Sequence, residues 1–175
     1  VYSVALNANT TAWFFGDTWV DRVKSDRHRN ATLVNNSVAI QQGADAATAK
    51  MRFFFGRAAN GQATAFIRPN DGRGWFWIFD GVKTPEGLYV FLIQIERTQG
   101  DAVFGFKVVG TWLAHVANPE APPAHWHLTQ AKVLWSTFSA TGGILWGSSI
   151  LAIDGYFFIY GTLEEGNGDI LQKHM

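Results

Sequence analysis

The stretch Trp13-Phe14-Phe15-Gly16-Asp17-Thr18-Trp19 decides how the rest of the chain is interpreted. Its apolar residues are typical of a largely buried β-strand, and one carboxylate, Asp17, follows directly after Gly16. Burying a charge at the end of an aromatic strand is unfavourable unless the charge faces water or a partner. Two interpretations follow: Asp17 is a functional residue that faces a water-filled cavity, or it belongs to an ordinary Gly-Asp-Thr turn.

The composition of the chain favours an all-β fold. Of the 175 residues, 15% are aromatic, 16% are charged and 18 are glycine. Strands alternate with turns throughout, and no stretch keeps a helical period. The 14 Lys and Arg residues balance the 14 Asp and Glu residues, so the charge predicts no nucleic-acid partner. No apolar run approaches the roughly 20 residues that span a bilayer. The absence of cysteine excludes disulfides and thiolate metal sites.

Three hairpins with a similar pattern repeat along the chain, and their second strands begin near residues 13, 88 and 157. A repeat of this size, with several strands in each unit, predicts the blades of a β-propeller. We expect one partial propeller domain over residues 1–175, with approximate blades at 1–70, 71–140 and an incomplete 141–175. Propellers close with about four to eight blades. Because the polar segment Glu164–Met175 shows no closing strand, the chain is expected to be a fragment.

Polar residues within apolar segments are further candidates. Asn35 and Asn36 interrupt the predicted strand Thr32–Gln42, and their amides need partners in the backbone or in a cavity. His125 and His127 have a spacing that ligates metals when both lie on one face of a strand. No third ligand lies nearby, which favours ordinary surface or core histidines. We therefore predict neither a metal site nor a cofactor.

Four motifs occur in a recognisable order: Trp13–Trp19, Val34–Gln41, Trp75–Gly81, and Leu145–Ser149 with Tyr156–Thr162. Together they resemble uncharacterised bacterial five-bladed β-propeller domains related to glycoside hydrolases, some of which are similar to endo-D-arabinanases. More distantly, the chain is similar to glycoside hydrolase family 43. The resemblance covers nearly the whole chain and implies that it supplies about the first three of five blades. It also implies a secreted or periplasmic location.

The resemblance implies specific roles for two aspartates. Asp17 would be presented to a central pocket by the inner strand of the first blade, and Asp80, which follows the aromatic strand Trp75–Phe79, would be its counterpart on the second. Family 43 adds a glutamic general acid from the third blade, but the corresponding segment, Trp146–Ile150, contains no Glu. Either the two aspartates act alone, or another blade supplies the acid, or the protein only binds sugar.

Glycoside hydrolysis needs two carboxyl groups that flank the scissile bond, and Asp17 and Asp80 are the predicted pair. The other predicted substrate contacts are rings for stacking, amides for hydroxyl groups and one cation: Trp19, Trp75, Trp77, Asn35, Asn36 and Arg22. We expect a glycoside hydrolase-like propeller that acts on a polysaccharide. The alternative is a non-catalytic propeller that binds carbohydrate or protein, since a fold does not fix a function. The oligomeric state is left open.

Overall fold

The computed structural model of the protein describes residues 1–21, 30–45, 47–99, 105–139, 141–166 and 171–174. Within these ranges the chain consists of β-strands and irregular segments, and the one helical element is a short 3-10 helix, η1 (Pro123–His125). The all-β prediction is therefore confirmed. No helix in the described ranges is long and apolar enough to cross a membrane.

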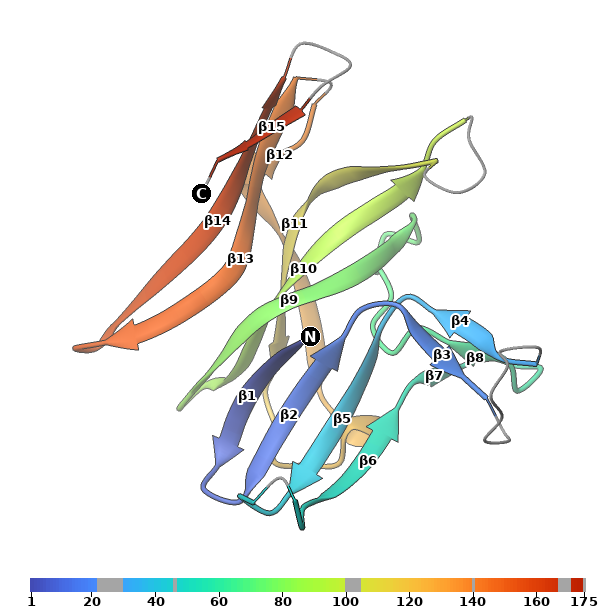
Figure 1. Cartoon of the computed structure of the whole chain (residues 1–175), viewed down its shortest axis with the longest axis vertical. Coiled ribbons are helices and arrows are strands. Elements are labelled where there is room, and N and C mark those ends of the chain that lie inside the picture. Colours follow the sequence, from blue (N-terminus) through green and yellow to red (C-terminus); the bar gives the residue numbers. More distant parts are fainter. Residues whose placement is uncertain (22–29, 46, 100–104, 140, 167–170, 175) are drawn as a thin grey trace.

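Most of the strands form three antiparallel sheets (Figure 1). The first sheet contains β1 (Tyr2–Asn7), β2 (Thr10–Phe15), β5 (Ser37–Gln42) and β6 (Lys50–Phe54). The second contains β9 (Trp75–Thr84), β10 (Gly87–Arg97), β11 (Phe106–Val116) and β12 (Leu128–Thr137). The third contains β13 (Gly142–Ile153), β14 (Tyr156–Gly166) and β15 (Leu171–His174). Two small ribbons pair β3 (Thr18–Val20) with β4 (Thr32–Val34) and β7 (Gly56–Arg57) with β8 (Ala63–Thr64).

The three hairpins predicted from the sequence are the first two strands of the three sheets. β1 pairs with β2, β9 with β10 and β13 with β14, each in antiparallel register. The first strands of the sheets also lie together: β1 contacts β9, and β9 contacts β13 (Figure 1). The sheets are therefore arranged one beside the next through their first strands. Within the described residues they do not close into a barrel.

Alternating residues of the second sheet enter two separate cores. On β10, Leu92 packs into the core shared with the first sheet, which contains Phe14 and Phe76. The next residue, Ile93, packs on the opposite face, into the core shared with Leu145 of the third sheet. Successive side chains of a strand point to opposite faces. Each side chain fully buried in this way contributes about 1.5–3 kcal/mol, so burial on both faces holds the three sheets together.

Three predicted boundaries differ from the structure. The strand expected over Thr32–Gln42 is split into β4 and β5 by Asn35 and Asn36, because Asn36 bonds outside the ladder. β9 does not end before Asp80, as the Asp-Gly pair predicted; it continues to Thr84 through a register irregularity. The C-terminal segment, expected to lack a strand, contains β15, which pairs with β14.

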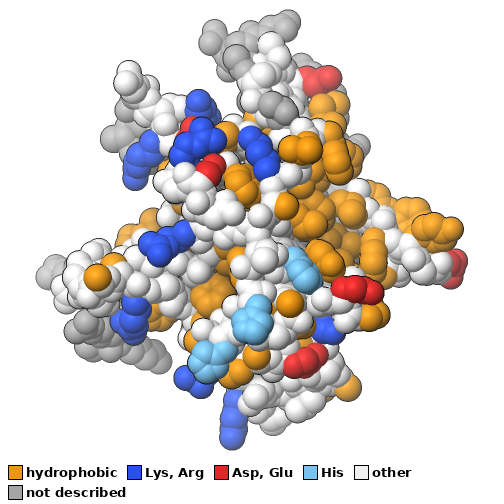
Figure 2. All heavy atoms as spheres, turned by 180° about the vertical axis from the view of Figure 1, so that it is seen from behind, with side chains coloured by type: hydrophobic (Ala, Val, Ile, Leu, Met, Phe, Trp, Pro, Cys, Tyr) orange, Lys and Arg blue, Asp and Glu red, His pale blue; other side chains and the backbone are white. Residues whose placement is uncertain are grey.

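The hairpin of β13 and β14 exposes large apolar side chains on both of its faces. Leu151 and Phe158 are paired on one face, while Ile159 lies on the other. Figure 2 shows hydrophobic side chains gathered over one side of the molecule. An apolar groove of about 480 Å³ separates this hairpin from the second sheet, with Phe91 and Leu113 among its lining residues. Contiguous apolar surface of this kind marks a site of contact with another protein, a membrane or a ligand.

Candidate functional site

Asp17 lies in the connection between β2 and β3, on the surface, and accepts a hydrogen bond from the first strand of the second sheet. The indole Nε1 of Trp77 on β9 donates to Asp17 Oδ1 at 3.0 Å. Oδ2 of Asp17 accepts no hydrogen bond within the described residues. The preceding residue, Gly16, lies against the indole, because a Cβ there would be 3.9 Å from Trp77 Cδ1. The sequence motif thus places one exposed carboxylate at the edge of an aromatic ring of the neighbouring sheet.

Asn35 lies on the connection that runs beside the one carrying Asp17. Phe15 pairs with Ser37 and Thr18 pairs with Val34, so the two connections between these pairs run side by side. Asn35 is half-buried and makes no side-chain hydrogen bond within the described residues. Asp17 and Asn35 therefore lie on neighbouring connections, where the first sheet gives way to the β3–β4 ribbon.

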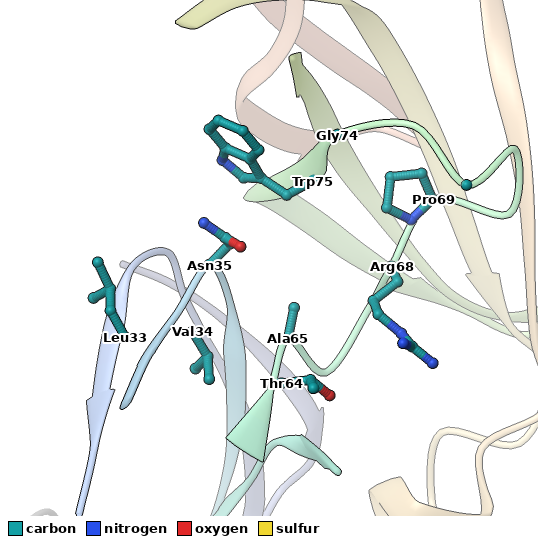
Figure 3. Close-up of a pocket in the computed structure, with 10 residues that line it drawn as sticks. Leu33, Val34, Asn35, Thr64, Ala65, Arg68, Pro69, Gly74 and Trp75 are labelled. Atoms are coloured by element: carbon teal, nitrogen blue, oxygen red, sulfur yellow. The ribbon is translucent and has the colours of Figure 1, made fainter. Parts of the chain in front are cut away.

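A pocket of about 670 Å³ opens beside this point (Figure 3). Its walls come from the β3–β4 ribbon, the strand β8 and the turn that precedes β9; they comprise Leu33, Val34, Asn35, Thr64, Ala65, Arg68, Pro69, Gly72, Gly74 and Trp75. This volume is within the range of about 300–1,000 Å³ that is typical of small-molecule sites. Figure 3 shows the indole nitrogen of Trp75 on the side of the ring that faces Asn35.

Two buried polar atoms at the pocket have no hydrogen-bond partner: Trp75 Nε1 and Thr64 Oγ1. Buried polar groups in folded proteins are nearly always paired, so unpaired ones beside a cavity call for an explanation. The Trp75 ring itself is firmly held, with its centroid 6.5 Å from that of Trp77 and 6.3 Å from that of Phe106. Its N–H is therefore held in one position, buried behind the pocket wall.

The turn before β9 fixes the position of Trp75. Buried Gln94 donates through Nε2 to both Asp71 carboxylate oxygens, each at 3.1 Å, and to Arg73 O at 3.0 Å. Gly74 has φ +61°, and a Cβ there would overlap the Ile95 carbonyl oxygen, so only glycine fits. Desolvation acts to raise the pKa of Asp71, but the hydrogen bonds from Arg73 and Gln94 and the Arg73 charge together lower it.

Asp80 occupies a different environment. Its Oδ1 accepts the backbone N–H of Gly81 at 2.8 Å, and its Oδ2 accepts that of Ile150 on β13, also at 2.8 Å. It is half-buried and joins the first strands of the second and third sheets. Burial raises the pKa of the nearby Tyr2 hydroxyl, and the Asp80 charge raises it further. Asp80 is three residues from Trp77, which corresponds to about 10 Å along a strand.

Asn36 is structural rather than accessible. Its side chain is fully buried, its Nδ2 donates to Ile67 O and Phe76 O at 2.9 Å each, and its Oδ1 accepts from Ile67 N at 2.8 Å. A ligand cannot reach this amide. Instead of the predicted sugar contact, the Asn36 side chain makes hydrogen bonds that connect the first two sheets. Trp19 is exposed on β3, opposite Leu33 of the pocket wall. Arg22 lies outside the described residues.

The structure thus brings together four predicted residues, Asp17, Asn35, Trp75 and Trp77. The carboxylate of Asp80 bonds instead to the backbone of Gly81 and Ile150. Arg68 and Thr64 of the pocket wall were not predicted. Arg68 carried the same signal as Asp17, a charge directly after an apolar strand-like segment, here Ala63–Ile67. No group of three His, Cys, Asp or Glu residues within the described ranges is placed to hold a metal ion.

Comparisons with known proteins place the chain in a family. No curated protein sequence matches it. Among solved structures, a protein from Bacteroides ovatus ATCC 8483, described as a "putative hydrolase", is similar with a TM-score of 0.64 and 13% identity over 98% of this chain. The chain spans 46%, about half, of that protein, and at this identity the likeness shows the fold alone. The family model for a domain of unknown function, DUF5005, matches residues 1–175, and the chain belongs to this family.

Proposed function

We propose that the chain forms part of a glycoside hydrolase-like β-propeller and binds a carbohydrate polymer beside Asp17. The propeller is supported by three sheets of antiparallel neighbouring strands whose first strands contact each other in turn. Blades of this kind pack face to face around an axis. The exposed apolar faces of the β13–β14 hairpin are the surfaces on which a further blade would dock.

The carbohydrate site is supported by one arrangement above all: the hydrogen bond from Trp77 Nε1 to Asp17, beside a pocket lined by Trp75 and Asn35. Sugars combine apolar ring faces with hydroxyl groups that both donate and accept hydrogen bonds. Aromatic rings with a few converging polar groups suit such a ligand. Asp17 supplies an acceptor for a hydroxyl, Asn35 an amide, and Trp75 an aromatic ring. A polysaccharide ligand accords with the proposed secreted or periplasmic location.

Hydrolysis and binding alone are two versions of this proposal. Hydrolysis needs a second carboxyl group about 5–9.5 Å from the first, and Asp80 is the partner that the sequence proposes. Binding without hydrolysis is favoured by one observation: both Asp80 oxygens already accept backbone N–H groups, whereas Asp17 keeps one oxygen free of such bonds within the described residues. The fold likeness to a protein described as a putative hydrolase supports the catalytic version.

The test measures binding and hydrolysis of furanose and pyranose polymers by the unmodified protein and by Asp17→Asn, Asp80→Asn and, as a control, Asp154→Asn in the exposed β13–β14 turn. We expect Asp17→Asn to weaken binding by about tenfold, which corresponds to about 1.4 kcal/mol. If the protein is an enzyme, release of reducing ends falls in the same variant. Unchanged binding and turnover in both Asp17→Asn and Asp80→Asn would exclude this site. Binding with no turnover selects the non-catalytic version.

A further inference from the structure

We infer that the pocket selects a carbohydrate with a carboxylate group, a uronic acid, and that Arg68 recognises it. This inference rests on the proposed function and adds the substrate class. Arg68 is exposed and is the one charged residue among those lining the pocket. The pocket wall therefore carries one positive charge, while the Asp17 carboxylate lies outside that wall, beside Trp77.

Arg68 differs from the other described arginines in having no partner for its guanidinium group. Arg73 pairs with Asp71 and Glu96, with Nε–O distances of 3.3 and 3.7 Å. The remaining described arginines lie over aromatic rings: Arg52 over Phe54, Arg57 over Phe55 and Arg97 over Trp75. No ion pair, hydrogen bond or ring contact engages the Arg68 side chain within the described part of the chain. A carboxylate fits this group, because the planar guanidinium fork binds carboxylates through two parallel hydrogen bonds.

A carboxylate is the natural complement of the Arg68 guanidinium at this wall. Trp75 Nε1 and Thr64 Oγ1 are themselves buried, so the exposed Arg68 side chain is the donor that a ligand can reach there. A carboxylate is acceptor-only and offers about four lone-pair sites. Figure 3 shows Asn35 near Trp75 at one end of the pocket and the Thr64 and Arg68 side chains at the other. One sugar ring of the polymer would lie against Trp75, and the carboxylate of another sugar would be directed to Arg68.

The experiment uses oligosaccharides of polygalacturonate, alginate and glucuronoxylan, each in its native form and in a form whose carboxyl groups have been chemically reduced to alcohols. These matched pairs keep the linkages and change only the charge. Binding is measured by titration calorimetry for the unmodified protein, Arg68→Gln, Arg68→Lys and the control Arg57→Gln. Arg57 is exposed and lies outside this pocket, so its replacement removes the same charge elsewhere.

We expect the unmodified protein to bind at least one acidic oligosaccharide about tenfold or more tightly than its reduced form, a preference that weakens with salt. Arg68→Gln should abolish the preference, Arg68→Lys should restore part of it, and Arg57→Gln should keep it. Equal affinity for the native and reduced forms, or a preference that survives in Arg68→Gln, overturns the inference. If neutral sugars bind and Asp17→Asn abolishes that binding, the proposed function stands while this inference falls. If no carbohydrate binds, both fall.

Discussion

Two adjacent asparagines lie in opposite environments: Asn36 belongs to the interior of the molecule and Asn35 to its candidate site. Asn36 is fully buried and uses both its donors and its carbonyl oxygen to join the first sheet to Ile67 and to Phe76 of the second sheet. Asn35 lines the pocket and bonds to no described residue through its side chain. Of two consecutive residues, one therefore has a side-chain amide that connects parts of the structure, and the other has an amide that is available to a ligand. The same residue type serves both purposes because the break between β4 and β5 directs the two side chains differently.

Asp17 and Asp80, which are far apart in the sequence, show the same contrast between an accessible and a structural side chain. Asp17 and Asp80 both follow aromatic strand residues, yet Asp17 is exposed and accepts an indole N–H, whereas Asp80 accepts two backbone N–H groups between the second and third sheets. What differs is the backbone: the chain leaves the sheet at Asp17 and continues through it at Asp80. A carboxylate within a continuing strand is available to the neighbouring sheet, and one at a strand end is available to solvent.

Replacing Asn36 should produce the largest effect. Asn36→Ala removes three hydrogen bonds and leaves Ile67 N and two carbonyl oxygens without partners in a buried environment, which we expect to lower the free energy of unfolding by about 3 kcal/mol. Asn35→Ala is the matched control and should change stability by less than about 0.5 kcal/mol. Urea unfolding followed by tryptophan fluorescence measures both. Similar losses of unfolding free energy in the two variants would contradict the assignment of Asn36 to the interior and Asn35 to the candidate site.

Replacing the aspartates should give a smaller but parallel contrast. Asp80→Ala removes both hydrogen bonds from a charged acceptor and leaves Ile150 N unpaired, which should lower stability by about 1.5–3 kcal/mol. Asp17→Ala removes one surface hydrogen bond and should cost less than about 1 kcal/mol. Chemical denaturation of the two variants in parallel gives the comparison. If Asp17→Ala proved the more destabilising variant, Asp17 would have a structural role, and its assignment to the candidate site would be contradicted.

The sequence predicted the sheets better than the positions of their polar residues. Aromatic and β-branched alternation identified the strand pairs β1–β2, β9–β10 and β13–β14, because burial on two faces requires that pattern. It could not distinguish Asn35 from Asn36, since their roles depend on Ile67 and Phe76, which are distant in sequence. Nor could it show that the strand passes through Asp80, because Asp-Gly is equally typical of a turn. Arg68 was not predicted, because its lack of a partner depends on three-dimensional contacts that the sequence does not show.

A third aspartate, Asp71, should give the smallest effect, and one that depends on pH. Hydrogen bonds from Arg73 and Gln94 lower the pKa of Asp71 in the folded protein despite its partial desolvation. A lowered folded pKa means that the stabilisation is present above the unfolded pKa of about 3.9 and is lost as pH falls through the folded value. The unfolding free energy, followed from pH 5 down to about 2, should therefore fall less steeply in Asp71→Asn than in the unmodified protein.

The control for this titration is Asp154→Asn, which removes one negative charge from the exposed turn between β13 and β14. Asp154 has φ +50°, a conformation that asparagine adopts readily, so the replacement keeps the turn. Because the Asp71 turn leads directly into Gly74 and Trp75, carbohydrate affinity should weaken over the same acidic range in the unmodified protein. A stability loss without any loss of affinity would show that the turn does not position Trp75 for the ligand and that its ring contacts with Trp77 and Phe106 are sufficient.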